Sequence, residues 1–106
     1  MADKFLTSRT APTAGNAASK SLVAASAGNS VFLWKVVIQT TTATTDNVIF
    51  QDGSGGTTLL NVQLPVNTTL VLPFDEIPLA VTTVGNGLFF QTASTTIVTA
   101  YYTTCP

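Results

Sequence analysis

Short runs of β-branched and aromatic residues, separated by turn residues, recur along this chain at a spacing of about ten residues. Threonine occurs 20 times and valine 11 times, and β-branched side chains favour the pleated surface of a strand over a helix. Many short strands with regular turn signals are typical of a sandwich or barrel. The pattern predicts strands over Ser21–Ala25, Val31–Thr40, Val48–Gln51, Thr58–Leu64, Thr69–Leu72, Leu79–Val84, Leu88–Gln91 and Ile97–Tyr102.

The sequence therefore predicts an all-β fold, an about eight-stranded antiparallel jelly-roll-like β-sandwich over residues 20–106. An immunoglobulin-like sandwich is the alternative, but the paired cysteines typical of that fold are missing, since Cys105 is the single cysteine. Residues 1–19 are rich in Ala, Ser and Thr and show no sustained strand or helix period. Such a segment buries too little apolar area to offset the entropy of ordering, so it is predicted to be a flexible or extended N-terminal arm.

The strongest predicted strand, Val31–Thr40, is apolar along most of its length. Strict alternation would place one set of side chains on the core face, namely Phe32, Trp34, Val36 and Ile38. The opposite face would carry Leu33, Lys35, Val37 and Gln39. Other strands are apolar on both faces, whereas a two-layer sandwich normally keeps one face of each strand polar. This surplus of apolar residues predicts that subunits pack side by side.

Charged residues are scarce and unevenly placed. Only nine of 106 residues are charged, the net charge is -1, and every Lys or Arg lies at or before Lys35. A chain of this kind either enters a membrane or hides surface against other protein. The longest apolar run, Val31–Ile38, is interrupted by Lys35 and is far shorter than the roughly 20 residues of a spanning helix. The four bases are too few and scattered for a nucleic-acid footprint. We therefore expect protein partners, with neither a membrane nor a nucleic acid among them.

Residue types that carry out catalysis are sparse as well. The chain has no histidine, and the adjacent Asp75 and Glu76 would point apart rather than flank a substrate. Asp46 and Asp52 lack the alternating oxygens of a calcium loop between them. The glycines between Asp52 and Thr57 lack the lysine of a phosphate loop. We interpret these places as turns and expect no cofactor, no metal and no enzymatic activity. An active site shared between subunits is the alternative that one chain does not exclude.

Four segments of the second half follow one another in a recognisable order. They are Val48–Leu60 with an Asp-Gly turn, Leu72–Leu79 with a proline-flanked aromatic, Asn86–Thr92 with an Asn-Gly turn, and Ile97–Tyr102 with tandem tyrosines. This order resembles the small β-sandwich decoration (cement) proteins of tailed-bacteriophage capsids. The resemblance implies a jelly-roll subunit, usually a homotrimer, that binds the outer capsid surface and cements neighbouring copies of the major capsid protein. It also allows a head-fibre or tail-fibre module that binds a receptor or carbohydrate.

The resemblance and the charge pattern together give two sets of candidate residues. The expected capsid contacts are Lys4, Phe5, Arg9 and Lys20. The expected core or oligomer-packing residues are Trp34, Val36, Ile38, Phe50, Phe74, Leu88, Phe90 and Tyr102. The arm would order on the shell, so its removal is expected to leave a folded trimer that no longer coats capsids. Met1–Lys4 is not followed by the apolar run of a signal peptide, so we expect synthesis in the host cytoplasm and a final place in the virion.

Overall fold

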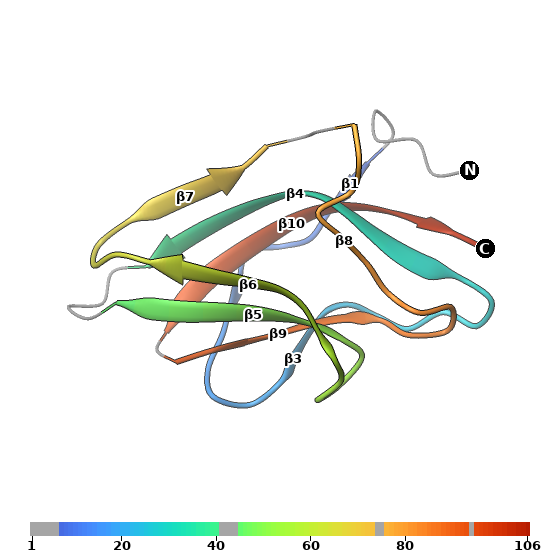
Figure 1. Cartoon of the computed structure of the whole chain (residues 1–106), viewed down its shortest axis with the longest axis horizontal. Helices are drawn as coiled ribbons and strands as arrows, with labels where there is room; N and C mark the ends of the chain where they lie inside the picture. Colours follow the sequence, from blue (N-terminus) through green and yellow to red (C-terminus); the bar gives the residue numbers. More distant parts are fainter. Residues whose placement is uncertain (1–6, 41–44, 74–75, 94) are drawn as a thin grey trace.

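The computed structural model describes residues 7–40, 45–73, 76–93 and 95–106, and every regular element among them is a β-strand. The strands are β1 (Ser8–Arg9), β2 (Thr13–Ala14), β3 (Lys20–Val23), β4 (Ser30–Thr40), β5 (Asp46–Asp52), β6 (Thr58–Leu64), β7 (Thr69–Leu72), β8 (Ala80–Val81), β9 (Leu88–Thr92) and β10 (Thr96–Cys105). Sheet A has the order β1-β10-β4-β7, with β2 also beside β10 and β8 also beside β4. Sheet B has the order β3-β9-β5-β6. The two antiparallel sheets pack face to face (Figure 1).

The strands pair from the two ends of the chain inward. β1 and β2 pair with β10, β3 pairs with β9, β4 pairs with β7 and β8, and β5 pairs with β6. Successive pairs alternate between sheets A and B, which is the topology of a jelly roll, a long hairpin rolled into two sheets. The ten segments fill eight strand positions, because β1 and β2 share one side of β10 and β7 and β8 share one side of β4. The predicted all-β, antiparallel, jelly-roll-like sandwich is confirmed.

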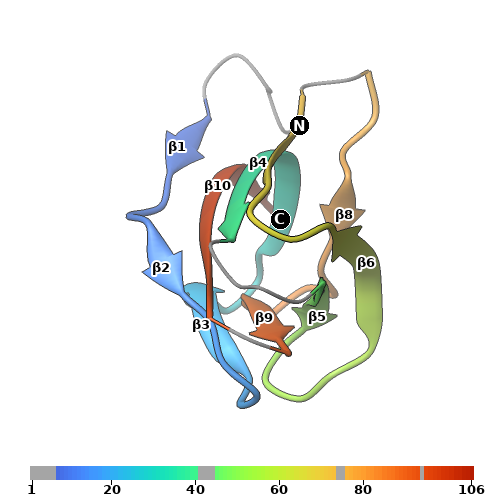
Figure 2. The same cartoon turned by 90° about the vertical axis from the view of Figure 1, so that its left-hand side faces the viewer.

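Residues before Lys20 supply the first strand position of the roll. Ser8 lies opposite Tyr102 and Thr13 lies opposite Val98. β1 and β2 therefore pair with the edge of β10 that faces away from β4 (Figure 2). The Thr10 N–H donates to the Ala100 carbonyl at 2.9 Å, and the Gly15 N–H donates to the Thr96 carbonyl at 2.8 Å. From Thr7 onward the chain is extended, as the predicted arm would be, but it is hydrogen-bonded into the sandwich rather than separate from it.

The hydrophobic core lies between the two sheets. Its largest side chains, Phe50 from β5 and Phe90 from β9, are fully buried. Among the predicted packing residues, Val36, Ile38 and Leu88 are also fully buried in this core, and Tyr102 packs against it from a half-buried position. Phe74 lies outside the described residues. Burial of such side chains stabilises the fold by about 1.5–3 kcal/mol each.

The alternation predicted for Val31–Thr40 is wrong at its centre. Lys35 lies opposite Tyr101 and Leu33 lies opposite Tyr102, so Trp34 has no residue opposite it in β10 and forms a β-bulge. The extra residue inverts the alternation. Leu33 is fully buried in the core, whereas Phe32 and Trp34 lie on the outer side of sheet A and belong to no part of the core cluster. Phe32 and Trp34 therefore do not share a face with Val36 and Ile38.

Candidate functional site

The outer side of sheet A carries several apolar and aromatic residues that the core does not use. Directly opposed residues of neighbouring antiparallel strands project from the same side of a sheet. Phe32 lies opposite Val81, and Val37 lies opposite Val71. We call this surface the aromatic face; its members are Arg9, Phe32, Trp34, Lys35, Val37, Val71, Val81, Ile97, Tyr101 and Thr103.

A stacked aromatic pair lies near one end of this face, beside Val81 of β8 and Thr103 of β10. The rings of Phe32 and Trp34 are stacked, with centroids 6.4 Å apart and planes inclined by 20°. The Trp34 Nε1–H donates a hydrogen bond of 2.8 Å to the Thr103 hydroxyl. Trp34 is only 6 % exposed, so it forms the floor of the aromatic face rather than a protruding contact. The bulge turns the Trp34 side chain away from the core, because a β-bulge changes the direction in which the inserted side chain points.

A row of two bases and a tyrosine crosses the same face. Arg9 of β1, Tyr101 of β10 and Lys35 of β4 lie in register on three adjacent strands. The Lys35 Nζ is 5.0 Å from the centroid of the Tyr101 ring, within the range of a cation–π contact. The five strands that define the face in the described part of the chain, β1, β4, β7, β8 and β10, contain no Asp or Glu. The aromatic face is therefore mainly apolar and carries two basic residues.

Three aliphatic side chains of the face are open to solvent. Val71 is 46 % exposed, and Val81 and Ile97 are each 39 % exposed. They come from three strands, β7, β8 and β10, so the exposed apolar area spreads across the sheet. Apolar side chains exposed on several strands of one sheet face indicate a place where another protein can bind.

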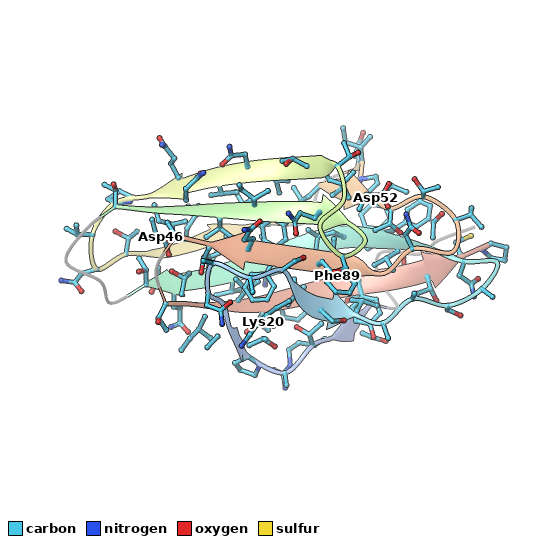
Figure 3. The ribbon with its side chains drawn as sticks, turned by 90° about the horizontal axis from the view of Figure 1, so that it is seen from below. Lys20, Asp46, Asp52 and Phe89 are labelled. Atoms are coloured by element: carbon cyan, nitrogen blue, oxygen red, sulfur yellow. The ribbon has the colours of Figure 1, made fainter. Side chains whose placement is uncertain are left out.

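The predicted contact residues do not gather at one place. Arg9 lies on the aromatic face, in sheet A. Lys20 begins β3 at the edge of sheet B (Figure 3), and its ammonium group donates to the Ala14 carbonyl at 3.0 Å. Lys4 and Phe5 lie outside the described residues. The sequence did not single out Val71, Val81 or Ile97; their position on one face depends on pairing between distant strands.

The acidic residues at the two ends of β5 hold turns in place (Figure 3). Asp46 is 1 % exposed and accepts hydrogen bonds from the Asn47 N–H at 2.8 Å, from the Ala93 N–H at 3.0 Å and from the Thr96 hydroxyl. It therefore fixes the connection between β9 and β10. The sequence interpretation of this aspartate as a turn residue fits these contacts.

Asp52 joins two turns that are distant in sequence. Its carboxylate accepts from the Thr83 N–H at 2.9 Å, from the Thr83 hydroxyl at 2.5 Å and from the Asn86 Nδ2–H at 3.0 Å. Burial raises the pKa of Asp52, but the hydrogen bonds from Thr83 and Asn86 outweigh it and hold the pKa below its usual 3.8. These bonds link the turn that follows β5 to the turn that precedes β9.

Chemically reactive groups do not converge in the described part of the chain. A cavity of about 240 Å³ on the outer side of sheet B is lined by Asn47, Ile49 and Gln91, with Ala17, Thr92 and Ala93, and none of these side chains titrates. Residues 7–40, 45–73, 76–93 and 95–106 contain no group of three or more His, Cys, Asp or Glu residues placed to hold a metal ion. The same ranges contain no helix long and apolar enough to cross a membrane.

Comparisons of the chain with protein-family models, with curated proteins and with solved structures found no match. The aromatic face therefore has to be interpreted from its own residues. A broad apolar surface with stacked rings and two bases has the composition of the core of a protein–protein interface, which is enriched in aromatic residues and arginine.

Proposed function

We propose that the chain is a structural protein of a phage virion that binds the outer surface of the capsid as an oligomer and cements neighbouring capsid subunits. The observation that carries this proposal is the aromatic face, on which Val71, Val81 and Ile97 are exposed on the same side of sheet A as a stacked aromatic pair. Such a surface suits a partner protein better than a small ligand, which is normally enclosed by a concave pocket. The location on a capsid, and a trimer as the oligomer, rest on the sequence resemblance alone.

Multivalent attachment would supply the cementing effect. A single aromatic face offers a modest contact area, but several faces joined in one oligomer bind a repeating lattice with an avidity that exceeds each separate affinity. A protein that binds only the assembled shell stabilises that shell by mass action. The exposed base of the face, Arg9, favours an acidic group on the capsid surface.

The structure changes the role expected for the N-terminal segment. Residues 7–19 complete sheet A, so in this proposal they are not a strap laid across the shell. Arg9 keeps its proposed contact role because it lies on the aromatic face. Lys20 loses its proposed contact role, because it lies in β3 at the edge of sheet B and its ammonium group bonds to the Ala14 carbonyl.

Co-sedimentation with undecorated empty capsids tests the proposal. The purified chain should pellet with the capsids and saturate at a fixed ratio to the capsid subunits. The double variant Val81→Ser/Ile97→Ser removes two exposed aliphatic groups from the aromatic face and should weaken binding by about tenfold, which corresponds to about 1.4 kcal/mol. Val84→Ser is the matched control, since Val84 is 56 % exposed but lies in the turn between β8 and β9, away from the face.

Two outcomes would count against the capsid role. A chain that stays in the supernatant at every capsid concentration contradicts the proposal directly. Equal weakening by the double variant and by Val84→Ser contradicts the assignment of the aromatic face. Signal from the isolated chain on a glycan array, without capsid binding, would instead support the head-fibre or tail-fibre module.

A further inference from the structure

The two long sides of the sandwich differ in the protection of their edge strands. On one side the edges are β1 and β2 in sheet A and β3 in sheet B. These strands carry Arg9 and Lys20, and residues 15–19 cross from one sheet to the other beside them. The crossing segment is held by the bond from the Thr92 N–H to the Asn16 carbonyl at 3.0 Å. Charged side chains and a covering segment are the usual devices that stop an edge from pairing with another chain.

On the opposite side the edges are β6 in sheet B and β7 and β8 in sheet A, and the turn 65–68 joins β6 to β7. The connection from β7 to β8 carries Glu76, but β6 and β7 themselves carry no charge. No charged residue occurs from Gly53 to Pro73. Val66 in the turn and Val71 in β7 are each 46 % exposed. We call β6, β7 and this turn the neutral edge; within the described residues, the strand that pairs with β6 is β5.

We propose that the neutral edge is a self-association surface, in which β6 of one copy pairs antiparallel with β6 of a second copy about a two-fold axis. The inference deepens the proposed function, because it supplies a contact that would join subunits into the oligomer. It also converts two four-stranded sheets into one continuous sheet across the pair. A two-fold contact gives an even-numbered assembly: two copies alone, or six where it combines with a three-fold contact.

The sequence of β6 fits a second copy better than an unrelated partner. In a two-fold pairing each residue meets its own strand again, so a charged residue near the axis would face a like charge. β6 has none, and its middle residue is the exposed Asn61. An amide is both donor and acceptor, so two copies of Asn61 can bond to each other across the axis. A net charge of -1 leaves little repulsion between copies as they approach.

The register follows from the length of β6. Full overlap of Thr58–Leu64 with its counterpart places Asn61 at the axis and Leu60 opposite Val62 of the second copy. The bulge in β6 falls at Leu59, between the pairs formed by Thr58 and Leu60 with β5, and therefore stays away from the axis. β8 lies near β6, but it is two residues long, so most of β6 remains open.

A lysine at the axis provides the test, measured as molar mass by sedimentation equilibrium over a range of concentrations. The unmodified chain should form dimers or hexamers, and Asn61→Lys should raise the dissociation constant of the two-fold contact at least tenfold. Ser21→Lys is the matched control, because Ser21 is exposed on β3, the other edge strand of sheet B. It should leave the mass distribution unchanged. An equimolar mixture of Asn61→Lys and Asn61→Glu should restore the pair, which separates loss of pairing from loss of folding.

The alternative outcomes overturn the inference. A monomer at every concentration, a pure trimer, or equal behaviour of Asn61→Lys and the unmodified chain would each contradict β6 pairing. Failure of the lysine–glutamate mixture to associate would do the same. Capsid co-sedimentation of Asn61→Lys separates failure of the β6 pairing from failure of the proposed capsid role. A pure trimer that still coats capsids removes the β6 contact and leaves the capsid role intact.

Discussion

Individual polar residues of this chain stabilise turns, and the sequence identified several of them. Asp46 and Asp52 were expected to satisfy turn backbones, and both accept hydrogen bonds from main-chain N–H groups. Most of their bonding partners, however, lie far along the chain. Asp52 binds Thr83 and Asn86, and a turn residue by itself does not reveal which distant turn it will hold.

The low pKa of Asp52 predicts how stability depends on pH. Because the folded carboxyl group has a lower pKa than the unfolded one, the unfolded chain binds more protons in acid, and stability rises with pH in that range. The contribution is complete above the unfolded pKa and is lost as pH falls through the folded pKa, below 3.8. Urea unfolding should show Asp52→Asn destabilised relative to the unmodified chain at pH 7, with the difference shrinking below pH 4.

A matched variant separates this effect from general acid sensitivity. Thr83→Val removes one donor to the carboxylate, so it should raise the pKa of Asp52 and move the acid-sensitive window to higher pH. A constant difference between Asp52→Asn and the unmodified chain at every pH would show that the charge of Asp52 does not contribute.

At the scale of strands, the local sequence pattern predicted most of the strands but not which strands pair with one another. The strands from Val31–Thr40 to Ile97–Tyr102 overlap strands of the structure. The predicted number of strands, about eight, matches the eight strand positions of the roll because two errors cancel. The prediction counted β7 and β8 as separate positions, and it omitted the position that β1 and β2 fill. These two segments are short, polar and separated by Pro12, so their extended conformation depends on pairing with β10 rather than on propensity.

The bulge at Trp34 explains why the aromatic face could not be predicted. A period-two pattern assigns faces correctly only while the register is unbroken. The break occurs in the pairing between β4 and β10, and nothing within Val31–Thr40 marks it. The adjacent tyrosines and the apolar surplus signalled an apolar outer surface, but not the strands that would build it.

The pairing of β1 and β2 predicts the outcome of N-terminal truncation. Removal of residues 1–14 deletes both strands and the paired bonds between Thr10 and Ala100. At about 1 kcal/mol per hydrogen bond, the free energy of unfolding should fall by about 2–4 kcal/mol, measured by urea denaturation. Removal of residues 1–6 keeps both strands and is the control. This expectation replaces the one drawn from the sequence, in which residues 1–19 could be removed from a folded subunit.

At the scale of the whole molecule, the few charges divide the surface into regions with different binding chemistry. Arg9 and Lys35 place basic side chains on the aromatic face, whereas the neutral edge has no charge from Gly53 to Pro73. A contact made by the first region includes attraction between ions, and a contact made by the second depends on backbone pairing and apolar burial. The two proposed contacts should therefore respond differently to salt.

Salt dependence measured on the same protein preparation tests this division. Between 0.1 M and 1 M NaCl the screening length falls from about 10 Å to about 3 Å. Capsid binding through the aromatic face should weaken over that range, because the basic side chains of the face lose attraction to an acidic shell. Self-association through β6 should not weaken, because the pairing strands carry no charge. Capsid binding that is insensitive to salt would remove Arg9 and Lys35 from the contact, and self-association that disappears in 1 M NaCl would show that charged residues outside the neutral edge join the subunits.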